Sequence, residues 1–330
     1  MDSEKIEIEI KKLKNELDVS IVAHFYQKDE VFNMADFRGD SLELAKWAAK
    51  DEKANLIFCG VGFMGQSVKI LAPQKRVFMP KIACCAMARM IDVDYFDQNI
   101  KILEQNGIKK ESIMPVTYIN SSAEVKARVG EMGGYVCTSS NAKKIITKAL
   151  DSGKKILFVP DRCLGQNIAT DMGLKSCVIG DGKDPNSVDI ICYNGFCSVH
   201  QLFEVEDIEF YRQKYPDILI VTHPECKPEV CAKSDFVGST SQIIKYIKEL
   251  PLTQKVAVGT EFNMVNRLRE ENTFVLSSTK PECPTMNETT LKDLYNTLIS
   301  IKEKRYENEI TISDEVRKYS FKALSRMFEL

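Results

Sequence analysis

The sequence of 330 residues has few tryptophan and histidine residues and no large excess of charge of either sign. It contains one tryptophan and three histidines, and its 45 basic and 47 acidic side chains leave a formal net charge of −2. Non-specific binding to nucleic acid needs a basic surplus, so no nucleic-acid partner is expected. Any acidic ligand must be held by a local arrangement of groups.

Long apolar runs are also missing. The first twenty residues alternate charged side chains with isoleucine and leucine, without the apolar core of a secretory signal. The most apolar stretch, residues 55–65, is far shorter than the roughly 20 residues needed to span a bilayer. We therefore expect a cytoplasmic protein without a membrane partner, in which most of the eleven cysteines are reduced thiols.

The clearest positive feature is a stretch of ten residues that occurs three times. The copies are VAHFYQKDEV at 22–31, VTYINSSAEV at 116–125 and VTHPECKPEV at 221–230. Each copy follows a β-branched, apolar run and leads into a predicted helix near its Glu-Val pair. Self-similarity of this kind indicates related structural units.

Each copy is followed by the same order of predicted elements. A hydroxyl residue, Ser41, Ser139 or Thr240, is predicted to cap a second helix, and two further strands follow with a helix between them. Strands that alternate with helices form parallel sheets. We predict an α/β fold of three pseudo-symmetric three-layer units, with short sheets around a central pseudo-threefold site. The predicted boundaries are 1–95, 96–200 and 201–286, with a helical extension at 287–330.

Cysteine follows the third predicted strand of every unit. Cys84 and Cys85 occupy the first of these loops, Cys197 the second and Cys283 the third. If the units pack around one axis, the three loops meet at the carboxyl ends of the sheets. Three thiolates suit a soft metal centre and would leave one iron of a [4Fe-4S] cluster without a protein ligand. The alternative is that these loop cysteines share no task, and spacing alone does not decide.

Equivalent positions of the repeat carry polar side chains. The third position holds His24, Tyr118 and His223, and the fifth holds Tyr26, Asn120 and Glu225. The remaining histidine, His200, lies three residues after Cys197. We interpret these side chains as candidate site residues. The shared glutamates lie in the first turn of a predicted helix, where they would stabilise its dipole, and we place them outside the site; they are Glu30, Glu124 and Glu229.

The hydroxyl residues at the predicted helix starts add candidate anion sites. A helix N-terminus offers unpaired N–H groups and partial positive charge. Simple capping is the alternative interpretation. The residues concerned are Ser41, Ser139, Ser239 and Thr240.

Short motifs follow one another in a fixed order along most of the chain: AHFYQ, ADFRGDSLELA, VTYINSSAEVKA, CTSSNA, GFCSVH, HPEC, DFVGST, GTE and CPTM. In these motifs the sequence resembles the iron-sulfur quinolinate synthases of NAD biosynthesis. The resemblance implies three pseudo-symmetric α/β domains around a [4Fe-4S] cluster. It also implies condensation of iminoaspartate, supplied by L-aspartate oxidase, with dihydroxyacetone phosphate to quinolinate, phosphate and two waters.

The resemblance implies Cys85, Cys197 and Cys283 as cluster ligands. Cys85 is preferred to Cys84 because its continuation CAMA matches the family pattern. The substrate-site positions implied are His24, Tyr26, Ser41, Tyr118, Asn120, Ser139, His200, His223, Glu225, Ser239 and Thr240. One departure from the family is Cys163, in PDRCLG, where many members have asparagine. Another is the stretch VGFMGQSVKIL, which lacks the histidine and the acidic residue often found there.

The chemistry of the implied reaction suggests roles. Glu225 and Tyr26 are candidates for proton transfer, and His200 is the third catalytic candidate. The other site residues would orient carboxylates and phosphate, and the open iron would polarise a leaving hydroxyl. Two alternatives are another [4Fe-4S] hydro-lyase acting on a small polycarboxylate and a cluster-based redox regulator. The latter requires a basic helix or a spare domain, and the sequence suggests neither.

Overall fold

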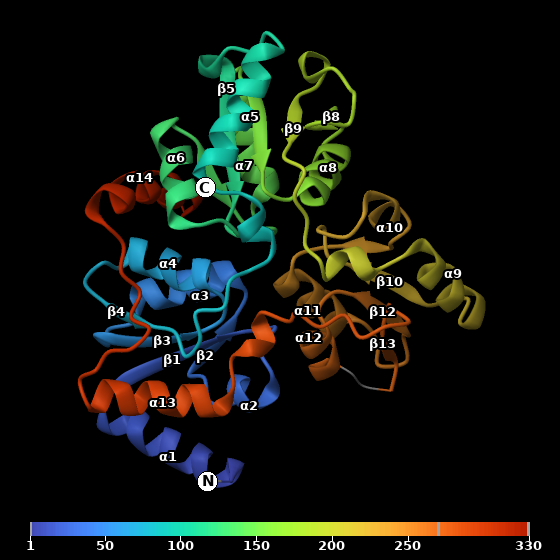
Figure 1. Ribbon diagram of the computed structural model, residues 1–330. Coiled ribbons are helices and arrows are strands. Elements are labelled where there is room, and N and C mark those ends of the chain that lie inside the picture. Colours follow the sequence, from blue (N-terminus) through green and yellow to red (C-terminus); the bar gives the residue numbers. More distant parts are fainter. Residues whose placement is uncertain (1, 269–270, 329–330) are drawn as a thin grey trace. The chain divides into compact units, whose positions relative to one another are not determined.

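The structure is a computed structural model that describes residues 2–268 and 271–328 (Figure 1). It divides into two compact units. The first comprises Met1–Cys85 with Cys283–Arg317, and the second comprises Ala86–Glu282 with Lys318–Leu330. Each unit is described by itself below.

The first unit contains one parallel sheet with the strand order β2-β1-β3-β4. Its strands are β1 (Val19–His24), β2 (Phe37–Gly39), β3 (Asn55–Cys59) and β4 (Arg76–Phe78). Every residue of β1 is buried, so the strand shows no alternation of apolar and polar side chains. This pattern is typical of a parallel strand covered by helices on both faces.

Helices cover both faces of this sheet (Figure 1). Two lie on one face, α1 (Ser3–Glu16) and α13 (Leu291–Lys302), and two on the other, α3 (Ser41–Lys50) and α4 (Gly62–Leu71). A short helix, α2 (Asp29–Phe32), follows β1. The apolar stripes of α1 and α13 meet β1 in one buried cluster, which includes Ile10, Leu13, Ile21, Leu294 and Leu298.

The second unit contains two parallel sheets, with the orders β6-β5-β7-β9-β8 and β11-β10-β12-β13. The strands of the first are β5 (Ile113–Tyr118), β6 (Tyr135–Cys137), β7 (Lys155–Val159), β8 (Ser176–Val178) and β9 (Ile190–Cys192). The strands of the second are β10 (Leu219–Thr222), β11 (Phe236–Val237), β12 (Val256–Gly259) and β13 (Thr273–Val275). Neighbouring strands pair in parallel throughout.

Helices connect these strands. They are α5 (Val93–Gln105), α6 (Ala123–Glu131), α7 (Ala142–Leu150), α8 (Arg162–Asp171), α9 (Val205–Lys214), α10 (Pro228–Ala232), α11 (Thr240–Glu249) and α12 (Phe262–Arg267). A last helix, α14 (Asp314–Ser325), packs against α6 at Gly130. A Cβ atom at Gly130 would overlap the carbonyl oxygen of Tyr319 in α14. Glycine is therefore required for this close approach.

The predicted fold class is confirmed, because the chain forms three short all-parallel sheets flanked by helices. Each of the three repeated stretches begins in the last residues of one strand, β1, β5 or β10, and continues into the loop that follows it. The arrangement of the three units about an axis and their boundaries stay predictions.

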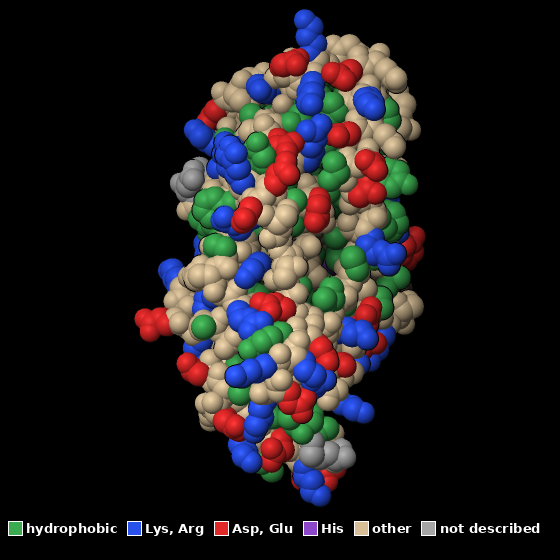
Figure 2. All heavy atoms as spheres, turned by 60° about the vertical axis from the view of Figure 1, so that its left-hand side comes forward, with side chains coloured by type: hydrophobic (Ala, Val, Ile, Leu, Met, Phe, Trp, Pro, Cys, Tyr) green, Lys and Arg blue, Asp and Glu red, His purple; other side chains and the backbone are tan. Residues whose placement is uncertain are grey.

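The surface carries mixed charge. On the face drawn in Figure 2, Lys and Arg side chains are interspersed with Asp and Glu side chains. Some form ion pairs, such as Arg128 with Asp97 at 2.7 Å. Within residues 2–268 and 271–328, no helix has the length and apolar character needed to cross a membrane.

Candidate active site

Polar side chains of the second unit gather at the carboxyl ends of strands from both of its sheets. Tyr118 is the last residue of β5, whereas His223 and Glu225 follow β10. His200 opens a short 3-10 helix in the connection after β9, and Thr260 follows β12. Ligand sites of parallel sheets lie at this edge, so these residues are the leading candidates for an active site.

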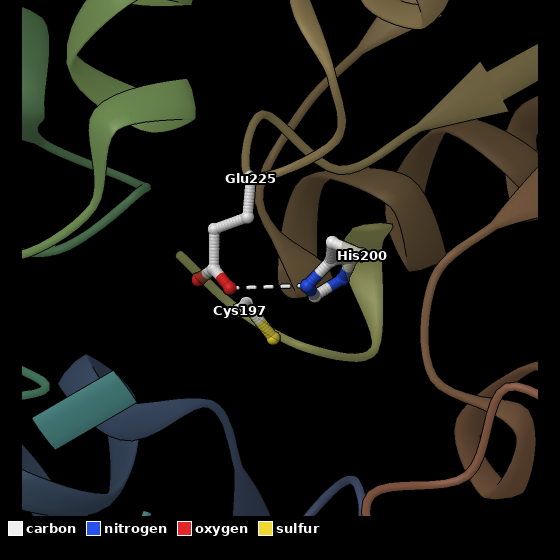
Figure 3. Close-up of side chains that lie close together, drawn as sticks. All are labelled: Cys197, His200 and Glu225. Carbon is white, nitrogen blue, oxygen red and sulfur yellow. Dashed lines mark hydrogen bonds and ion pairs between the residues drawn. The ribbon is translucent and has the colours of Figure 1, made fainter. Parts of the chain in front are cut away.

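Glu225 is at the centre of a buried chain of hydrogen bonds, of which Figure 3 shows the contact with His200. Its Oε1 accepts from the hydroxyl of Tyr118 at 2.6 Å, and its Oε2 lies 3.0 Å from Nδ1 of His200. The second ring nitrogen of His200, Nε2, is 3.1 Å from Oγ1 of Thr260. Glu225 is 4% exposed and His200 is 1% exposed. Since water is largely excluded, these polar contacts are strong and hold both side chains in one orientation.

The charge of Glu225 follows from its partners. Burial by itself raises the pKa of Glu225, but the charges of His200 and His223, with hydrogen bonds from His200 and Tyr118, lower it to about 2. The ring of His223 stacks on that of His200 with 4.6 Å between the centroids. Glu225 is therefore an ionised acceptor at neutral pH.

The first and third copies of the repeat form the same local turn. Nδ1 of His24 accepts a hydrogen bond from the backbone N–H of Tyr26 at 3.1 Å. In the same way, Nδ1 of His223 accepts from the backbone N–H of Glu225 at 3.3 Å. The third position of the repeat thus fixes the backbone of the fifth.

Asp161 was missed by the sequence analysis. It is fully buried and caps α8, where its Oδ1 accepts from the backbone N–H of Leu164 at 2.9 Å. Its Oδ2 has no hydrogen-bond partner in the part of the chain that the structure describes. Burial and the negative charge of Glu225 raise the pKa of Asp161 well above its usual range. The pKa values of the two carboxyls are thus shifted in opposite directions, as in acid–base pairs of enzymes.

A sequence signal for Asp161 did exist. It follows the second predicted strand of its repeat, and the third repeat has the acidic residue Glu261 at the same place. Both residues accept a hydrogen bond from a backbone N–H of the helix that follows. Thr260 was also missed as a site residue, although it lies in the motif GTE.

The structure brings five of the predicted site residues together: Tyr118, Cys197, His200, His223 and Glu225. Asn120 lies on the same loop as Tyr118, two residues further on, and is half-buried. The other predicted residues near the amino terminus, His24, Tyr26 and Ser41, belong to the first unit. Their roles stay predictions.

Two of the predicted helix caps, Ser41 and Ser139, do not occupy the cap position. The cap of α3 is Asp40, whose Oδ1 accepts from two backbone N–H groups, so Ser41 is the first helical residue. The cap position of α7 is Asn141, and Ser139 lies in the turn before it. A carboxylate caps as well as a hydroxyl, and the sequence pattern did not discriminate between Asp40 and Ser41. The side chain of Asn141 makes no capping hydrogen bond to α7, because its Oδ1 accepts from the backbone N–H of Thr138.

The third predicted cap is wrong by one residue. The side chain of Ser239 accepts from the backbone N–H of Gln242 and caps α11, so Thr240 is the first residue inside the helix. Ser239 and Ser139 line one groove of about 600 Å³ in the second unit. Lys144 also lines this groove, which therefore combines hydroxyl donors with a basic side chain.

Exposure divides the eleven cysteines into two groups. Cys84 is exposed and Cys85, Cys197 and Cys283 are half-buried, whereas the other seven are buried. Burial raises the pKa of the buried thiols, for example to about 12 for Cys231. Metals bind the thiolate form. The three predicted ligands are therefore among the thiols best suited to a metal, and three accessible thiols are a donor set that fits a [4Fe-4S] cluster.

Cys197 also lies close to the buried network. It offers a sulfur, and His200 and Glu225 offer a nitrogen and an oxygen, all within 4.8 Å of one another (Figure 3). Cys85 and Cys283 belong to the first unit. The second unit thus joins a candidate metal ligand to the candidate acid–base residues.

Comparisons with known proteins agree with these motifs. Residues 8–329 match the family model described as Quinolinate synthetase A protein. A quinolinate synthase of Helicobacter pylori is 55% identical over 97% of this chain and 97% of its own length. Quinolinate synthases of Acidobacterium capsulatum and Streptomyces coelicolor are 40% and 38% identical over 94% of this chain, and over 88% and 84% of their own lengths.

Proposed function

The chain belongs to the quinolinate synthase family of enzymes, and we propose that it condenses iminoaspartate with dihydroxyacetone phosphate. The products are quinolinate, one phosphate and two waters. The observation that carries this proposal is the buried chain from Tyr118 through Glu225 and His200 to Thr260. Successive eliminations need a carboxylate of fixed orientation in a site that excludes water.

Glu225 is the proposed proton acceptor. Its low pKa without substrate makes it a weak base. A substrate that brings carboxylates or phosphate next to Glu225 raises this pKa, because a like charge disfavours the ionised form. Binding thereby moves Glu225 toward the range of an effective base. Tyr26 and His200 are the other residues proposed to move protons.

The remaining predicted residues are proposed to hold the substrates. Nδ1 of His24 and of His223 is bound to the backbone two residues further on, and both side chains are proposed to orient a substrate oxygen. Tyr118 and Asn120 would bind the same substrate groups. The hydroxyl residues at helix starts would hold phosphate and carboxylate; they are Ser41, Ser139, Ser239 and Thr240.

Cys85, Cys197 and Cys283 are the proposed ligands of a [4Fe-4S] cluster. They are half-buried thiols on loops that follow the third predicted strand of each repeat. When bound, the cluster would supply an iron with an open coordination position, which acts as a Lewis acid toward a substrate hydroxyl. Cys84 is the neighbouring thiol that this assignment leaves without a role.

The proposed setting is the cytoplasm, with L-aspartate oxidase as the supplier of unstable iminoaspartate. The test of function is an anaerobic assay of cluster-loaded enzyme, in which quinolinate and phosphate are measured together. Equal amounts of both products, formed only when dihydroxyacetone phosphate is present, are expected. Turnover of a polycarboxylate without this phosphate ester would instead indicate a [4Fe-4S] hydro-lyase.

A further inference from the structure

Lys126 is a fully buried lysine beneath the loop of the second repeat. It lies on α6, and its Nζ donates to the carbonyl oxygen of Ile119 at 2.8 Å and to that of Ser121. These two carbonyls flank Asn120, a candidate site residue. The ammonium group is thus bound to the backbone on either side of Asn120.

Asn167 binds the loop of the third repeat in the same way. It lies on α8, and its Nδ2 donates to the carbonyl oxygens of Pro224 and Cys226, each at 2.8 Å. These two carbonyls flank Glu225. Because α8 belongs to the second repeat, this contact joins the second repeat to the third.

Asn120 and Glu225 occupy the same fifth position of the repeated ten residues. In both copies a nitrogen on a neighbouring helix spans the carbonyl before this position and the carbonyl after it. The donors come from different places, since Lys126 is on the helix that follows its own loop and Asn167 is on another helix of the unit. Two different side chains, Lys126 and Asn167, therefore make the same pair of hydrogen bonds around the fifth position of the repeat.

The burial of Lys126 is costly. Removal from water lowers the pKa of Lys126 to about 7, despite the opposing charge of Glu124. A methionine or leucine would fill this apolar position without that cost. The presence of an amine at this buried position therefore indicates that its hydrogen bonds to the loop have a function.

We infer that Lys126 and Asn167 are positioning residues that fix Asn120 and Glu225 in the geometry needed for substrate binding and proton transfer. The inference rests on the proposed function for the roles of Asn120 and Glu225. Displacement of a reacting group by about 1 Å can lower a rate by roughly 100-fold, so a loop held at both flanking carbonyls has a direct effect on catalysis.

The first test replaces Lys126 by Met. The matched control is Lys155→Met, because Lys155 also donates to two carbonyls, those of Asn186 and Val188, both at 2.8 Å and outside the site. Lys126→Met should raise KM by about tenfold with a smaller change in kcat, since it disturbs a binding residue. Lys155→Met should leave both constants unchanged.

The second test replaces Asn167 by Leu, with Asn99→Leu as its control. Asn99 is a buried amide of α5 that donates to the carbonyl of Tyr95 at 2.7 Å. Asn167→Leu should lower kcat by about 30-fold or more with KM little changed, because it releases the loop of the proposed base. Asn99→Leu should alter stability alone.

Hydrogen exchange followed by mass spectrometry gives a readout independent of activity. Peptides covering 118–122 and 223–227 should exchange faster in the Lys126 and Asn167 variants, respectively, and not in their controls. If Lys126→Met does not fold, Lys126→Gln, which keeps an amide donor, replaces it. Unchanged exchange in the two loops, or kinetic losses equal to those of the controls, would overturn the inference. Failure of the wild type to form quinolinate would instead reject the proposed function, and the exchange data would still test the two contacts.

Discussion

Tyr118 and Glu225 are 107 positions apart in the chain and are joined by a hydrogen bond of 2.6 Å. One residue ends a strand of the five-stranded sheet, and the other follows a strand of the neighbouring four-stranded sheet. The bond to an ionised carboxylate is charge-assisted and short. It therefore stabilises the ionised form of Glu225 and connects two repeats at the candidate site.

Tyr118→Phe removes this donor and leaves the ring in place. The pKa of Glu225 should rise, because one of the hydrogen bonds that lower it is lost. We nevertheless expect kcat/KM at neutral pH to fall about tenfold, equivalent to about 1.4 kcal/mol, because the bond that orients the Glu225 carboxylate is lost. The acidic limb of the pH profile should move to higher pH. A profile superimposable on that of the wild type would show that Tyr118 has no influence on the proposed base.

Glu225→Gln tests the base itself. Glutamine still accepts from Tyr118 but takes up no proton, so kcat should fall by about 100-fold or more while substrate affinity is retained. The control is Glu229→Gln, since Glu229 lies in the first turn of α10 and has no proposed part in the reaction. Anaerobic rates with iminoaspartate generated in situ would check both. Near-normal quinolinate production by Glu225→Gln removes Glu225 from the mechanism.

The long strands were predictable because each is a continuous apolar run, as in β1 and β7. The strands β2, β6, β8 and β11 were not predicted. They have two or three residues, and so short a stretch carries no period of its own. Each of them pairs with the edge of one neighbouring strand, and such pairing becomes available only in the folded chain.

The site was predictable where the repeat marked it, as at Glu225 and His223. Sequence position could not show which partner each side chain would meet, and so the bond between His200 and Thr260 was not foreseen. Asp161 was not singled out in the sequence. Its raised pKa depends on complete burial and on the nearby charge of Glu225, which are properties of the folded chain.

The assignment of Cys85, Cys197 and Cys283 as ligands predicts that serine at any of these positions removes the cluster. Anaerobically reconstituted wild type should hold about four irons and four sulfides per chain. Serine at Cys85, Cys197 or Cys283 should abolish the cluster, and serine at the exposed Cys84 should not. Iron and sulfide analysis with the visible spectrum gives the answer. Retention of the cluster by Cys85→Ser, with loss by Cys84→Ser, would move the assignment by one residue.

The serines of the groove separate binding from capping. Ser239 caps α11 and Ser139 does not cap α7. Ser139→Ala should therefore raise KM by about tenfold with an unchanged melting temperature. Ser239→Ala should raise KM and also destabilise the protein by about 1 kcal/mol. Unchanged kinetic constants in both variants would leave the two hydroxyls without a part in substrate binding.

The lowered pKa of the buried Lys126 should make the free energy of unfolding depend on pH. Its pKa is about 7 in the folded protein, against an ordinary value of 10.5. Between these values the unfolded chain holds a proton at Lys126 that the folded chain has released. The free energy of unfolding should therefore rise with pH in this window, by at most about 1.4 kcal/mol per pH unit, and level off toward pH 10.5.

The comparison of wild type with Lys126→Met isolates this contribution, because all other titrating groups are shared. From pH 6.5 to 8.5 the wild type should gain about 2 kcal/mol of unfolding free energy relative to the variant. Urea titrations of both proteins, without cluster, at the two pH values measure the gain. A constant difference would mean that Lys126 keeps its proton in the folded protein, and a difference that shrinks with rising pH would reverse the sign of the effect.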